Sequence, residues 1–519
     1  MNLQLAEHAS EIETRLRAHP GVREAVVLLW RSSEADPRLV AYVVPNNEYL
    51  DRTLAEANDE SRRIQKWRKT YELTQSGRES AISQPDFNIL GWNSSYTRLA
   101  IPEDQMREWV DLTVQEIQRF KPSEVLELGC GAGLLLLRLA RRCRRYVGVD
   151  NSPAVLEALK RQMNQLGGAW PQVELLERAA DQFDGFAMNS FDTLIINSVT
   201  QHFPSLNYLL NILEKAVRVV RPGGRIFLGD LRSLPLQGPF ATSVELFQAA
   251  PEMDVAQLRE RIRKRIRLDE QSILSPALFS ALGQRWPEIS HVELQPRQGR
   301  FDNEMNRYRF NAVLHLGAKP SLKIEPTWLS WPREKAPLES IASALEKQNL
   351  ESFGLTQVRN RRIEKDVLAF RELPSRSGLQ TVGSFKTDIQ QTADHGIDPQ
   401  DLWSLGTQLG YDVQMSWAAS KSDGSYDALF LRKHLHEAPN TALVAWPGLP
   451  MNHEDLTLFA NAPTKAVPRE KLLRQLRECC EQFPSEAMPP EIILMNELAL
   501  APDGKLDRQT LPSPDAILL

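Results

Sequence analysis

The chain has 519 residues, which is enough for three or four domains of about 150 residues each. A hydrophobic share of 42% and a charged share of 25% are ordinary for globular proteins, and the net charge of −5 gives no basic field for nucleic acid or anionic lipid. No apolar run approaches the roughly 18 residues of a membrane span, no signal peptide is evident, and the four cysteines do not form a zinc-type pattern. We expect a cytoplasmic protein with reduced thiols and no metal site, which binds neither nucleic acid nor a membrane.

The first part of the chain predicts a small piece of structure followed by a linker. Residues 1–45 suit one helix, carrying Ile12 and Leu16, and two β-branched strands at 22–29 and 39–44. This is too little for an independent domain. Residues 46–85 are strongly polar and are interpreted as a linker with some helix.

The central part, residues 86–320, alternates helical and strand patterns, which predicts a parallel α/β sheet. The expected elements are a helix at 109–120, a strand at 125–128, a helix at 134–142, a strand at 146–149, a helix at 155–165, strands at 173–176 and 191–197, a helix at 208–220 and a strand at 225–229.

The last part is less regular. Residues 321–439 are expected to extend the central domain, with helices at 338–346 and 399–409 and strands at 366–370 and 427–431. Residues 440–519 predict a strand at 442–445, a helix at 469–480 and a strand at 491–495. They are again too few for a domain, and we expect them to complete the fold begun by residues 1–45.

The strongest local motif is Glu-Leu-Gly-Cys-Gly-Ala-Gly at 127–133, between a predicted strand and a predicted helix. Glycines at 129, 131 and 133 let the backbone turn sharply and approach a ligand closely. Asp150 ends the next strand, where a carboxylate can accept hydrogen bonds from ribose hydroxyls. A dinucleotide-binding domain shares this layout, so the glycines alone leave the ligand open.

Two more acids lie near the ends of predicted strands, and they help to identify the kind of ligand. Glu127 beside the loop suits an ammonium or sulfonium group and would repel a pyrophosphate. Asp181, after the third strand, can accept from an adenine amino group. Either acid alone could equally be a solvated loop charge. Together with Asp150 they favour a ligand beyond the carboxyl ends of the strands, where open α/β sheets bind.

With Arg-Pro-Gly-Gly at 221–224 before a strand, residues 86–320 resemble a class I methyltransferase. The resemblance implies a Rossmann-like, mostly parallel seven-stranded sheet and S-adenosyl-L-methionine as the cofactor, with Asp150 on the ribose and Asp181 on the adenine. The residues then expected at the cofactor are Tyr96, Glu127, Gly129, Gly131, Gly133, Asp150, Asn151, Ala180, Asp181, Asn197 and Ser198.

More specific stretches at 91–96, 197–204, 229–233 and 303–310 together resemble the methyltransferase domains embedded in nonribosomal peptide synthetases. The flanks resemble the small C-terminal subdomain of an adenylation domain, in the signatures at 19–27, 483–490 and 500–508. This implies one small α+β subdomain, residues 1–45 and 440–519, into which the methyltransferase is inserted. Lys505 would be the adenylation lysine, inactive here because the sequence lacks the large adenylation subdomain.

An insertion at this place in the small subdomain implies N-methylation of the backbone α-amine of an aminoacyl thioester. The implied partners are an aminoacyl-loaded peptidyl carrier protein and the large adenylation subdomain of the same synthetase. The candidates on the acceptor side are Asn197, His202, Asp230, Glu304 and Tyr308. His202 and Tyr96 could equally be core residues.

Three other functions stay open at this point. They are O- or S-methylation of the tethered side chain, a non-catalytic docking platform and, more remotely, a dinucleotide oxidoreductase. A basic segment could dock an acidic carrier protein, or could be a solvated face with local ion pairs. Its residues are Arg259, Arg261, Arg263, Lys264, Arg265 and Arg267.

Overall fold

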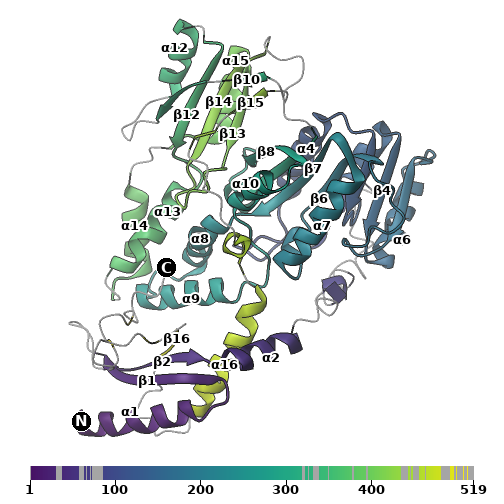
Figure 1. Ribbon diagram of the computed structural model, residues 1–519. Helices are drawn as coiled ribbons and strands as arrows, with labels where there is room; N and C mark the ends of the chain where they lie inside the picture. The colour runs from purple at the N-terminus through teal and green to yellow at the C-terminus, as the bar shows by residue number, and fades with distance from the viewer. Residues whose placement is uncertain are drawn as a thin grey trace. The chain divides into compact units, whose positions relative to one another are not determined.

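A seven-stranded sheet forms the centre of the larger of two structural units, with its strands in the order β5-β4-β3-β6-β7-β9-β8 (Figure 1). Its strands are β3 (Glu124–Leu128), β4 (Arg145–Asp150), β5 (Val173–Glu177), β6 (Phe191–Asn197), β7 (Val220–Arg232), β8 (Ile289–Pro296) and β9 (Arg309–Leu316). The five strands from β5 to β7 pair in parallel, and β9 is antiparallel to both of its neighbours. The Rossmann-like, mostly parallel sheet expected from the sequence is confirmed.

The computed structural model describes residues 2–30, 38–57, 64–65, 67–69, 72, 86–317, 322–324, 326–330, 338–348, 350–376, 379–392, 396–433, 442–444, 446–447, 455–461, 463–480, 491–495, 498, 507 and 511. The chain divides into a larger unit, residues 64–262 and 271–461, and a smaller unit, residues 1–63, 263–270 and 462–519. Lys505, residues 483–490 and nearly all of the 500–508 signature lie outside the described residues.

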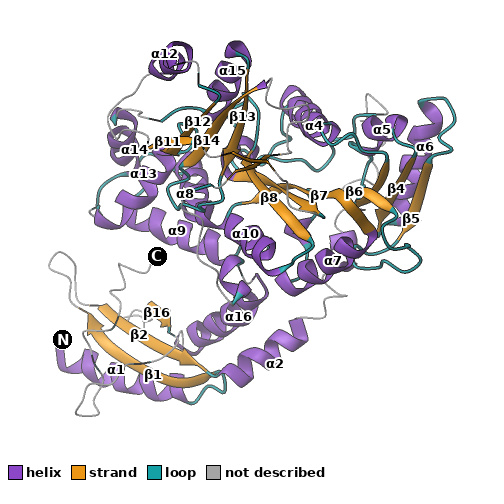
Figure 2. Cartoon of the chain, turned by 45° about the horizontal axis from the view of Figure 1, so that its top comes forward, coloured by secondary structure: helices purple, strands orange, loops and turns teal. Residues whose placement is uncertain are grey.

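Helices cover both faces of the large sheet (Figure 2). One face carries α4 (Glu103–Gln118), α5 (Leu136–Leu139) and α6 (Pro153–Gln165), and the other carries α7 (Leu206–Val219) and α10 (Pro276–Arg285). Between β7 and β9 the chain also forms α8 (Gln237–Gln248), α9 (Val255–Arg267) and the short α11 (Glu304–Tyr308). Strand residues alternate between the two cores: Val125 packs with α4, α5 and α6, while Leu126 packs with α7 and α10. The sheet is therefore buried on both faces, as a parallel sheet requires.

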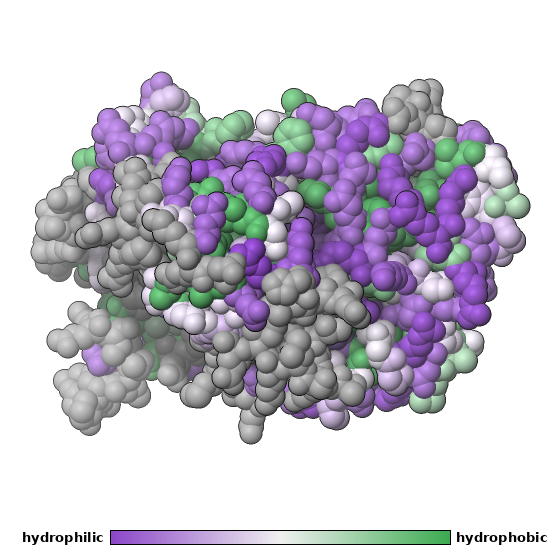
Figure 3. Space-filling model, turned by 90° about the horizontal axis from the view of Figure 1, so that it is seen from above, coloured by the Kyte–Doolittle hydropathy of each residue, from purple (hydrophilic) through white to green (hydrophobic). Residues whose placement is uncertain are grey.

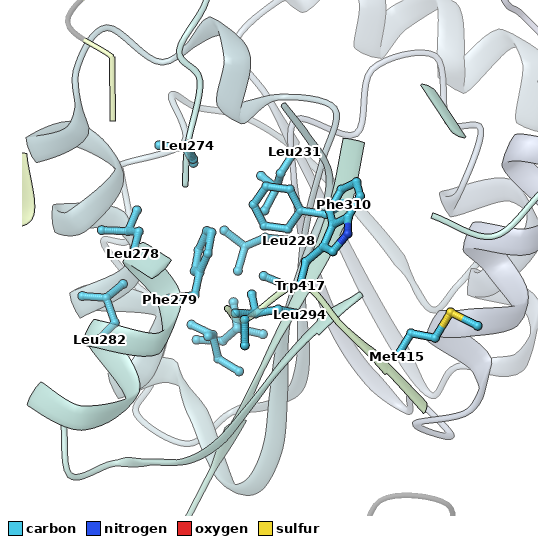
Figure 4. Close-up of a cluster of buried hydrophobic side chains, with 14 of the residues drawn as sticks. Leu228, Leu231, Leu274, Leu278, Phe279, Leu282, Leu294, Phe310, Met415 and Trp417 are labelled. Carbon is cyan, nitrogen blue, oxygen red and sulfur yellow. The ribbon is translucent and has the colours of Figure 1, made fainter. Parts of the chain in front are cut away.

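Residues 322–444 add a second sheet to the same unit. Its strands β11 (Thr327–Ser330), β12 (Ser352–Val358), β13 (Tyr411–Ser416) and β14 (Tyr426–Arg432) lie in the order β11-β12-β14-β13. The accompanying helices are α12 (Leu338–Gln348), α13 (Glu364–Glu372), α14 (Val382–Gln391) and α15 (Pro399–Leu409). Trp417 packs among Leu228, Leu294 and Phe310 of the large sheet (Figure 4), and its backbone N–H bonds to Leu294 O at 2.8 Å. The extension and the large sheet therefore share one core.

Two local predictions from the sequence are wrong. The strand expected at 366–370 lies inside helix α13, because Ile363, Val367 and Phe370 recur at helical rather than alternating spacing and Val367 is buried. The helix expected at 134–142 is one α-turn followed by a 3-10 turn, Ala140–Arg142, because the preceding glycine loop keeps the chain from becoming helical before Leu136.

The two ends of the chain form the smaller unit together. Its elements are α1 (Asn2–Arg17), β1 (Val22–Trp30), β2 (Arg38–Pro45), α2 (Asn47–Ala57), α16 (Pro463–Cys480) and β16 (Glu491–Leu494). The central strand β2 pairs antiparallel with β1 and parallel with β16. Ile12 and Ala41 pack in one core with Leu476 and Ile492. Strand β15 (Ala442–Val444) pairs instead with β10 (Leu322–Ile324). Residues 442–461 therefore belong to the larger unit, which extends past the domain boundary predicted at residue 440.

Among the described residues, no helix has the length and apolar character of a membrane-spanning helix. The face in Figure 3 is largely hydrophilic, with hydrophobic residues in small separate groups.

Candidate functional site

The glycine loop between β3 and α5 is built so that only glycine fits at its key positions. Gly129, Gly131 and Gly133 have φ angles of 74°, 50° and 77°, a region that disfavours other residues. A Cβ at Gly129 would lie 2.5 Å from Val199 Cγ2, and one at Gly133 would lie 2.4 Å from Leu159 Cδ1. The backbone of the loop therefore stays bare, as a cradle for a closely approaching ligand must.

Asp150 ends β4 directly beside this loop. Its Oδ2 accepts a hydrogen bond from Gly131 N at 3.0 Å, and its Oδ1 accepts one from Ser152 N at 3.0 Å. Burial raises the pKa of this carboxyl, while the backbone N–H groups act in the opposite direction. Each carboxylate oxygen keeps a lone pair, so both can also accept from ribose hydroxyls. Asn151, the next residue predicted at the cofactor, accepts a hydrogen bond at its backbone O from Arg68 Nη1, at 3.5 Å.

Asp181 and Ala180 lie beyond the end of β5. Tyr208 OH donates to Asp181 Oδ1 at 2.9 Å, and Lys215 Nζ donates to Asp181 O at 2.8 Å. These contacts fix the direction of the carboxyl group from helix α7. Among the described residues, Oδ2 of Asp181 accepts no hydrogen bond, so it has room for a further donor.

Glu127 has a different environment from the other two acids. It is buried, and Tyr146 OH donates to its Oε2 at 2.8 Å. Burial raises the pKa of Glu127 to about 8, with the nearby Asp150 acting in the same direction and the Tyr146 hydroxyl against it. The carboxyl group is therefore mostly neutral at pH 7, and a nearby cation would favour its ionised form.

Asn197 and Ser198 form the tip of β6. Asn197 Nδ2 donates to Ser198 Oγ at 3.3 Å, whereas Asn197 Oδ1 is buried and has no hydrogen-bond partner among the described residues. A buried acceptor without a donor is costly, which points to a group that the protein itself does not supply. Gly229 on β7 leaves the space for this amide, since a Cβ there would lie 2.1 Å from Asn197 Oδ1.

Asp230 is fully buried, and its own oxygens are already engaged. Ser198 Oγ donates to Oδ2 at 2.8 Å, Arg309 Nη1 lies 2.5 Å from Oδ2, and Trp109 Nε1 donates to Oδ1 at 3.4 Å. Arg309 also lies 3.8 Å from Glu304. Two acids predicted on the acceptor side are thus joined by one guanidinium.

Glu304 ties an early segment to this network. Its Oε2 accepts from Ser95 N at 2.8 Å, and its Oε1 accepts from Ser95 Oγ at 2.9 Å. The neighbouring Tyr96 OH lies 2.8 Å from Ser243 Oγ, which also receives Tyr308 OH at 2.9 Å. The structure therefore links Tyr96, which was predicted at the cofactor, to Tyr308, a candidate on the acceptor side.

His202 lies in a 3-10 turn, Thr200–His202, after β6. Burial, with Arg309 and Arg232 nearby, lowers the pKa of its imidazole to about 3. The ring is stacked on Trp67, with centroids 3.3 Å apart and an angle of 12° between the planes. His202 is therefore neutral at physiological pH and can accept a hydrogen bond without acting as a strong base.

Three residues of this region were missed by sequence reasoning: Trp67, Ser243 and Asp366. Each lies in a different segment far from the glycine loop, and no motif marks it. Trp67 is part of a stretch interpreted as linker, and Asp366 lay in a predicted strand. Only tertiary packing brings them to the strand tips.

The basic segment of residues 259–267 lies in helix α9, and part of its positive charge is paired within the protein. Arg259 Nε donates to Leu373 O at 3.0 Å, and Arg261 Nε lies 2.7 Å from Glu245 Oε2. These two residues are therefore tied to the protein itself. Among the described residues, no group of His, Cys, Asp or Glu is arranged to hold a metal ion.

A family model described as "Methyltransferase domain" matches residues 126–228, which run from β3 through the glycine loop to β7. The N-methyltransferase NodS from Bradyrhizobium japonicum, a solved structure, is 16% identical and covers 40% of this chain and 94% of its own, at a TM-score of 0.26.

Large biosynthetic enzymes match nearly the whole chain. Chondramide synthase cmdD of Chondromyces crocatus is 35% identical over 97% of this chain and 13% of its own length. A probable non-canonical nonribosomal peptide synthetase, CymA of Salinispora arenicola, is 29% identical over 98% and 6%. Cyclosporin synthetase simA of Tolypocladium inflatum is 26% identical over 97% and 3%. The chain thus spans a small part of each of these relatives.

Proposed function

We propose that this chain, a methyltransferase segment of the nonribosomal peptide synthetase family, N-methylates the backbone α-amine of an aminoacyl thioester held on a carrier protein. The observation that carries the proposal is the convergence of the glycine loop, Asp150 and Asp181 at the tips of adjacent parallel strands, inside a chain similar to synthetases at both ends. The donor is S-adenosyl-L-methionine. When bound, it supplies an electrophilic methyl group on a positively charged sulfur.

The residues of the chain fit this cofactor. The bare backbone of Gly129 to Gly133 leaves room for its amino-acid end, and Asp150 has lone pairs for ribose hydroxyls. Asp181, held by Tyr208, accepts from the adenine amino group. Glu127 can regain its charge beside a cation. A pyrophosphate would meet three carboxyl groups here, which argues against a dinucleotide.

An α-amine needs little help from a base before it attacks. Its reference pKa is about 7.7–8.0, and the electron-withdrawing thioester carbonyl lowers it, so a sizeable neutral fraction exists near pH 7. Much of the acceleration can come from holding the amine in line at about 3–3.5 Å from the methyl carbon. Asn197 Oδ1, buried and without a donor, supplies a hydrogen-bond acceptor that orients the amine, and the neutral imidazole of His202 follows it in the chain.

Asp230 acts through other groups in this proposal. It holds Ser198 and Arg309 in place, and Arg309 in turn reaches Glu304. We therefore assign Asp230 and Glu304 a positioning role.

The partners follow from the same proposal. A loaded peptidyl carrier protein presents the acceptor. The large adenylation subdomain of the synthetase completes the adenylation domain, whose small subdomain contains Lys505. The large adenylation subdomain takes no part in the methyl transfer itself, so the methyltransferase can be assayed with loaded carrier protein alone.

The test is to incubate the full chain with S-adenosyl-L-methionine and carrier protein loaded with a series of amino acids. Fragmentation of the product in a mass spectrometer separates the α-nitrogen from the side chain. We expect one added methyl group on the fragment that holds the α-nitrogen. A methyl group found only on side-chain oxygen or sulfur, or no transfer to any aminoacyl carrier, would refute N-methylation.

A further inference from the structure

A cluster of oxygen atoms lies next to the strand tips and has no assigned role. Tyr96, Ser243, Tyr308 and Asp366 contribute these atoms from four separate segments of the larger unit. Tyr308 O accepts from Ser233 N at 3.1 Å, directly after β7. The cluster therefore lies at the carboxyl end of the strand that carries Asp230, on the acceptor side of the proposed site.

The hydroxyl groups of the cluster are linked to one another. Its four contacts join Tyr96 OH to Ser243 Oγ at 2.8 Å, Tyr308 OH to Ser243 Oγ at 2.9 Å, Ser243 Oγ to Phe240 O at 2.9 Å, and Tyr308 OH to Asp366 Oδ2 at 2.5 Å. Asp366 meets both of its partners, Tyr308 and Arg307, through Oδ2. Its Oδ1 accepts no hydrogen bond from the described residues, so it can accept one from a donor outside the protein.

The charges point to a donor that is an amine. Asp366 lies 3.5 Å from Arg307, but Arg307 already pairs with Asp302, whose Oδ2 accepts from Nη2 at 2.6 Å. The set of Asp366, Arg307 and Asp302 thus contains two carboxylates and one guanidinium. Burial raises the pKa of Asp366, while Arg307 and the Tyr308 hydroxyl act in the opposite direction. A hydrogen bond from an amine would also favour the ionised form of this carboxyl group.

Aromatic rings form the walls around these oxygens. Phe240 lies 5.0 Å from the Tyr308 ring, and Phe247 lies 5.5 Å from the Tyr96 ring, between centroids. Phe247 is 58% exposed, so the cluster borders the surface on its Tyr96 side. A carboxylate oxygen beside these rings can accept a hydrogen bond from the N–H of an incoming amine.

We propose that Asp366, from the extension that follows the methyltransferase core, anchors the acceptor amine by accepting an N–H hydrogen bond within the cluster of Tyr96, Ser243 and Tyr308. This inference rests on the proposed function and identifies the acceptor side of that site. It also gives the extension a part in substrate recognition, because α13 supplies the carboxylate.

Binding measurements on the full chain, saturated with S-adenosylhomocysteine, test this assignment. The probes are stable amide analogues of alanyl- and phenylalanyl-pantetheine, and their counterparts without the amine, propionyl- and 3-phenylpropionyl-pantetheine. Wild type is expected to prefer an amine-bearing probe by about tenfold or more, the value of a hydrogen bond to a charged group. Asp366→Asn should reduce this preference to near unity and leave the affinity for S-adenosylhomocysteine unchanged.

Asp302→Asn is the matched control, because Asp302 pairs with the same Arg307 but its side chain is 70% exposed. It should keep the wild-type preference. Tyr308→Phe, which removes only the hydroxyl next to Asp366, should weaken the preference and serves as the decisive variant if Asp366→Asn does not fold.

The outcomes separate the two proposals. If wild type prefers the amine and both Asp366→Asn and Tyr308→Phe retain that preference, the anchoring role is wrong while N-methylation stands. If wild type shows no preference for the amine, the anchoring role is wrong as well, and N-methylation is decided by the mass-spectrometric assay alone.

Discussion

At the scale of single residues, the three acids predicted at the strand tips occupy three distinct environments. Asp150 is held by two backbone N–H groups, Asp181 by a tyrosine hydroxyl, and Glu127 is buried with a raised pKa. Their order along the chain and their place at strand ends could be predicted, because parallel strands bring such positions to one edge. Their individual hydrogen bonds could not, since Tyr146 and Tyr208 come from other elements.

Replacement of Asp150 by alanine tests the ribose contact. We expect affinity for S-adenosyl-L-methionine to fall by roughly 10–100-fold, because hydrogen bonds to a charged group are worth about 1.5–3 kcal/mol. Isothermal titration calorimetry measures the effect. Glu177→Gln is the matched control, since Glu177 pairs with Asp150 in the sheet register but is exposed. Equal affinities in Asp150→Ala and wild type would contradict the assignment.

Glu127 predicts a pH dependence of stability. Its pKa is about 8 in the folded chain against an ordinary value of 4.5, so the folded state binds more protons between these values. The protonated Glu127 therefore stabilises the folded state fully below pH 4.5. This stabilisation is lost as the pH rises toward 8, so the free energy of unfolding falls over this range. Glu127→Gln should lose less stability over this range, by up to a few kcal/mol.

Urea unfolding of both proteins at several pH values checks the Glu127 prediction. Parallel curves for wild type and Glu127→Gln across this range would show that the carboxyl group does not titrate there.

Residues such as Ser243 and Asp366 show the limit of sequence reasoning at this scale. They carry no motif, and their environment comes entirely from packing between α8, α11 and α13. Asp230 shows a related limit. Its position at the end of β7 was predictable, but its saturation by Arg309 and Ser198 was not.

At the scale of elements, the glycine loop is the part most strongly dictated by sequence. Gly133 has a φ of 77°, and helix α6 approaches so closely that a Cβ would meet Leu159. The opposite case is α13, where a short apolar run at 366–370 suggested a strand. An apolar run of this length does not distinguish a strand from a helix unless the neighbouring turns are included, and Ile363 lies one turn before the run.

Gly133→Ala tests the need for a bare loop. We expect a loss of about 1–3 kcal/mol in stability, from the positive φ and the clash with Leu159, together with weaker binding of S-adenosyl-L-methionine. Gly167→Ala separates the two causes, since Gly167 has a similar φ of 67° with no heavy atom within 4 Å of a Cβ. It should cost about 1 kcal/mol or less and leave binding unchanged. Thermal unfolding and calorimetric titration measure both effects, and unchanged binding in Gly133→Ala would count against the loop as the cofactor cradle.

At the scale of the whole molecule, the two chain ends share one sheet and one core, as the resemblance to a split adenylation subdomain implies. Long insertions of this kind cost little entropy when the ends of the insertion are held together. The pairing of β16 with β2 could be predicted only through that resemblance, because a local sequence pattern does not indicate which distant strand will be the neighbour in the sheet.

Leu476→Ala tests the division into two units. Leu476 is fully buried in the core of the smaller unit, so its truncation should cost about 2–5 kcal/mol there. We expect the unfolding transition of that unit to move to lower temperature in scanning calorimetry, while affinity for S-adenosyl-L-methionine stays at the wild-type value. Arg474→Ala on the same helix, whose side chain is 72% exposed, should change neither. A parallel loss of cofactor affinity in Leu476→Ala would show that the larger unit depends on the smaller one.

The central claim is that a sulfonium cofactor lies across the strand tips, between the glycine loop and the acids. A crystal structure of the chain grown with S-adenosylhomocysteine tests it most directly. We predict electron density against the backbone of Gly129 to Gly133, with the ribose hydroxyls on Asp150 and the adenine amino group on Asp181. Density elsewhere, or an empty cleft at saturating ligand with both carboxylates turned away, would contradict the account.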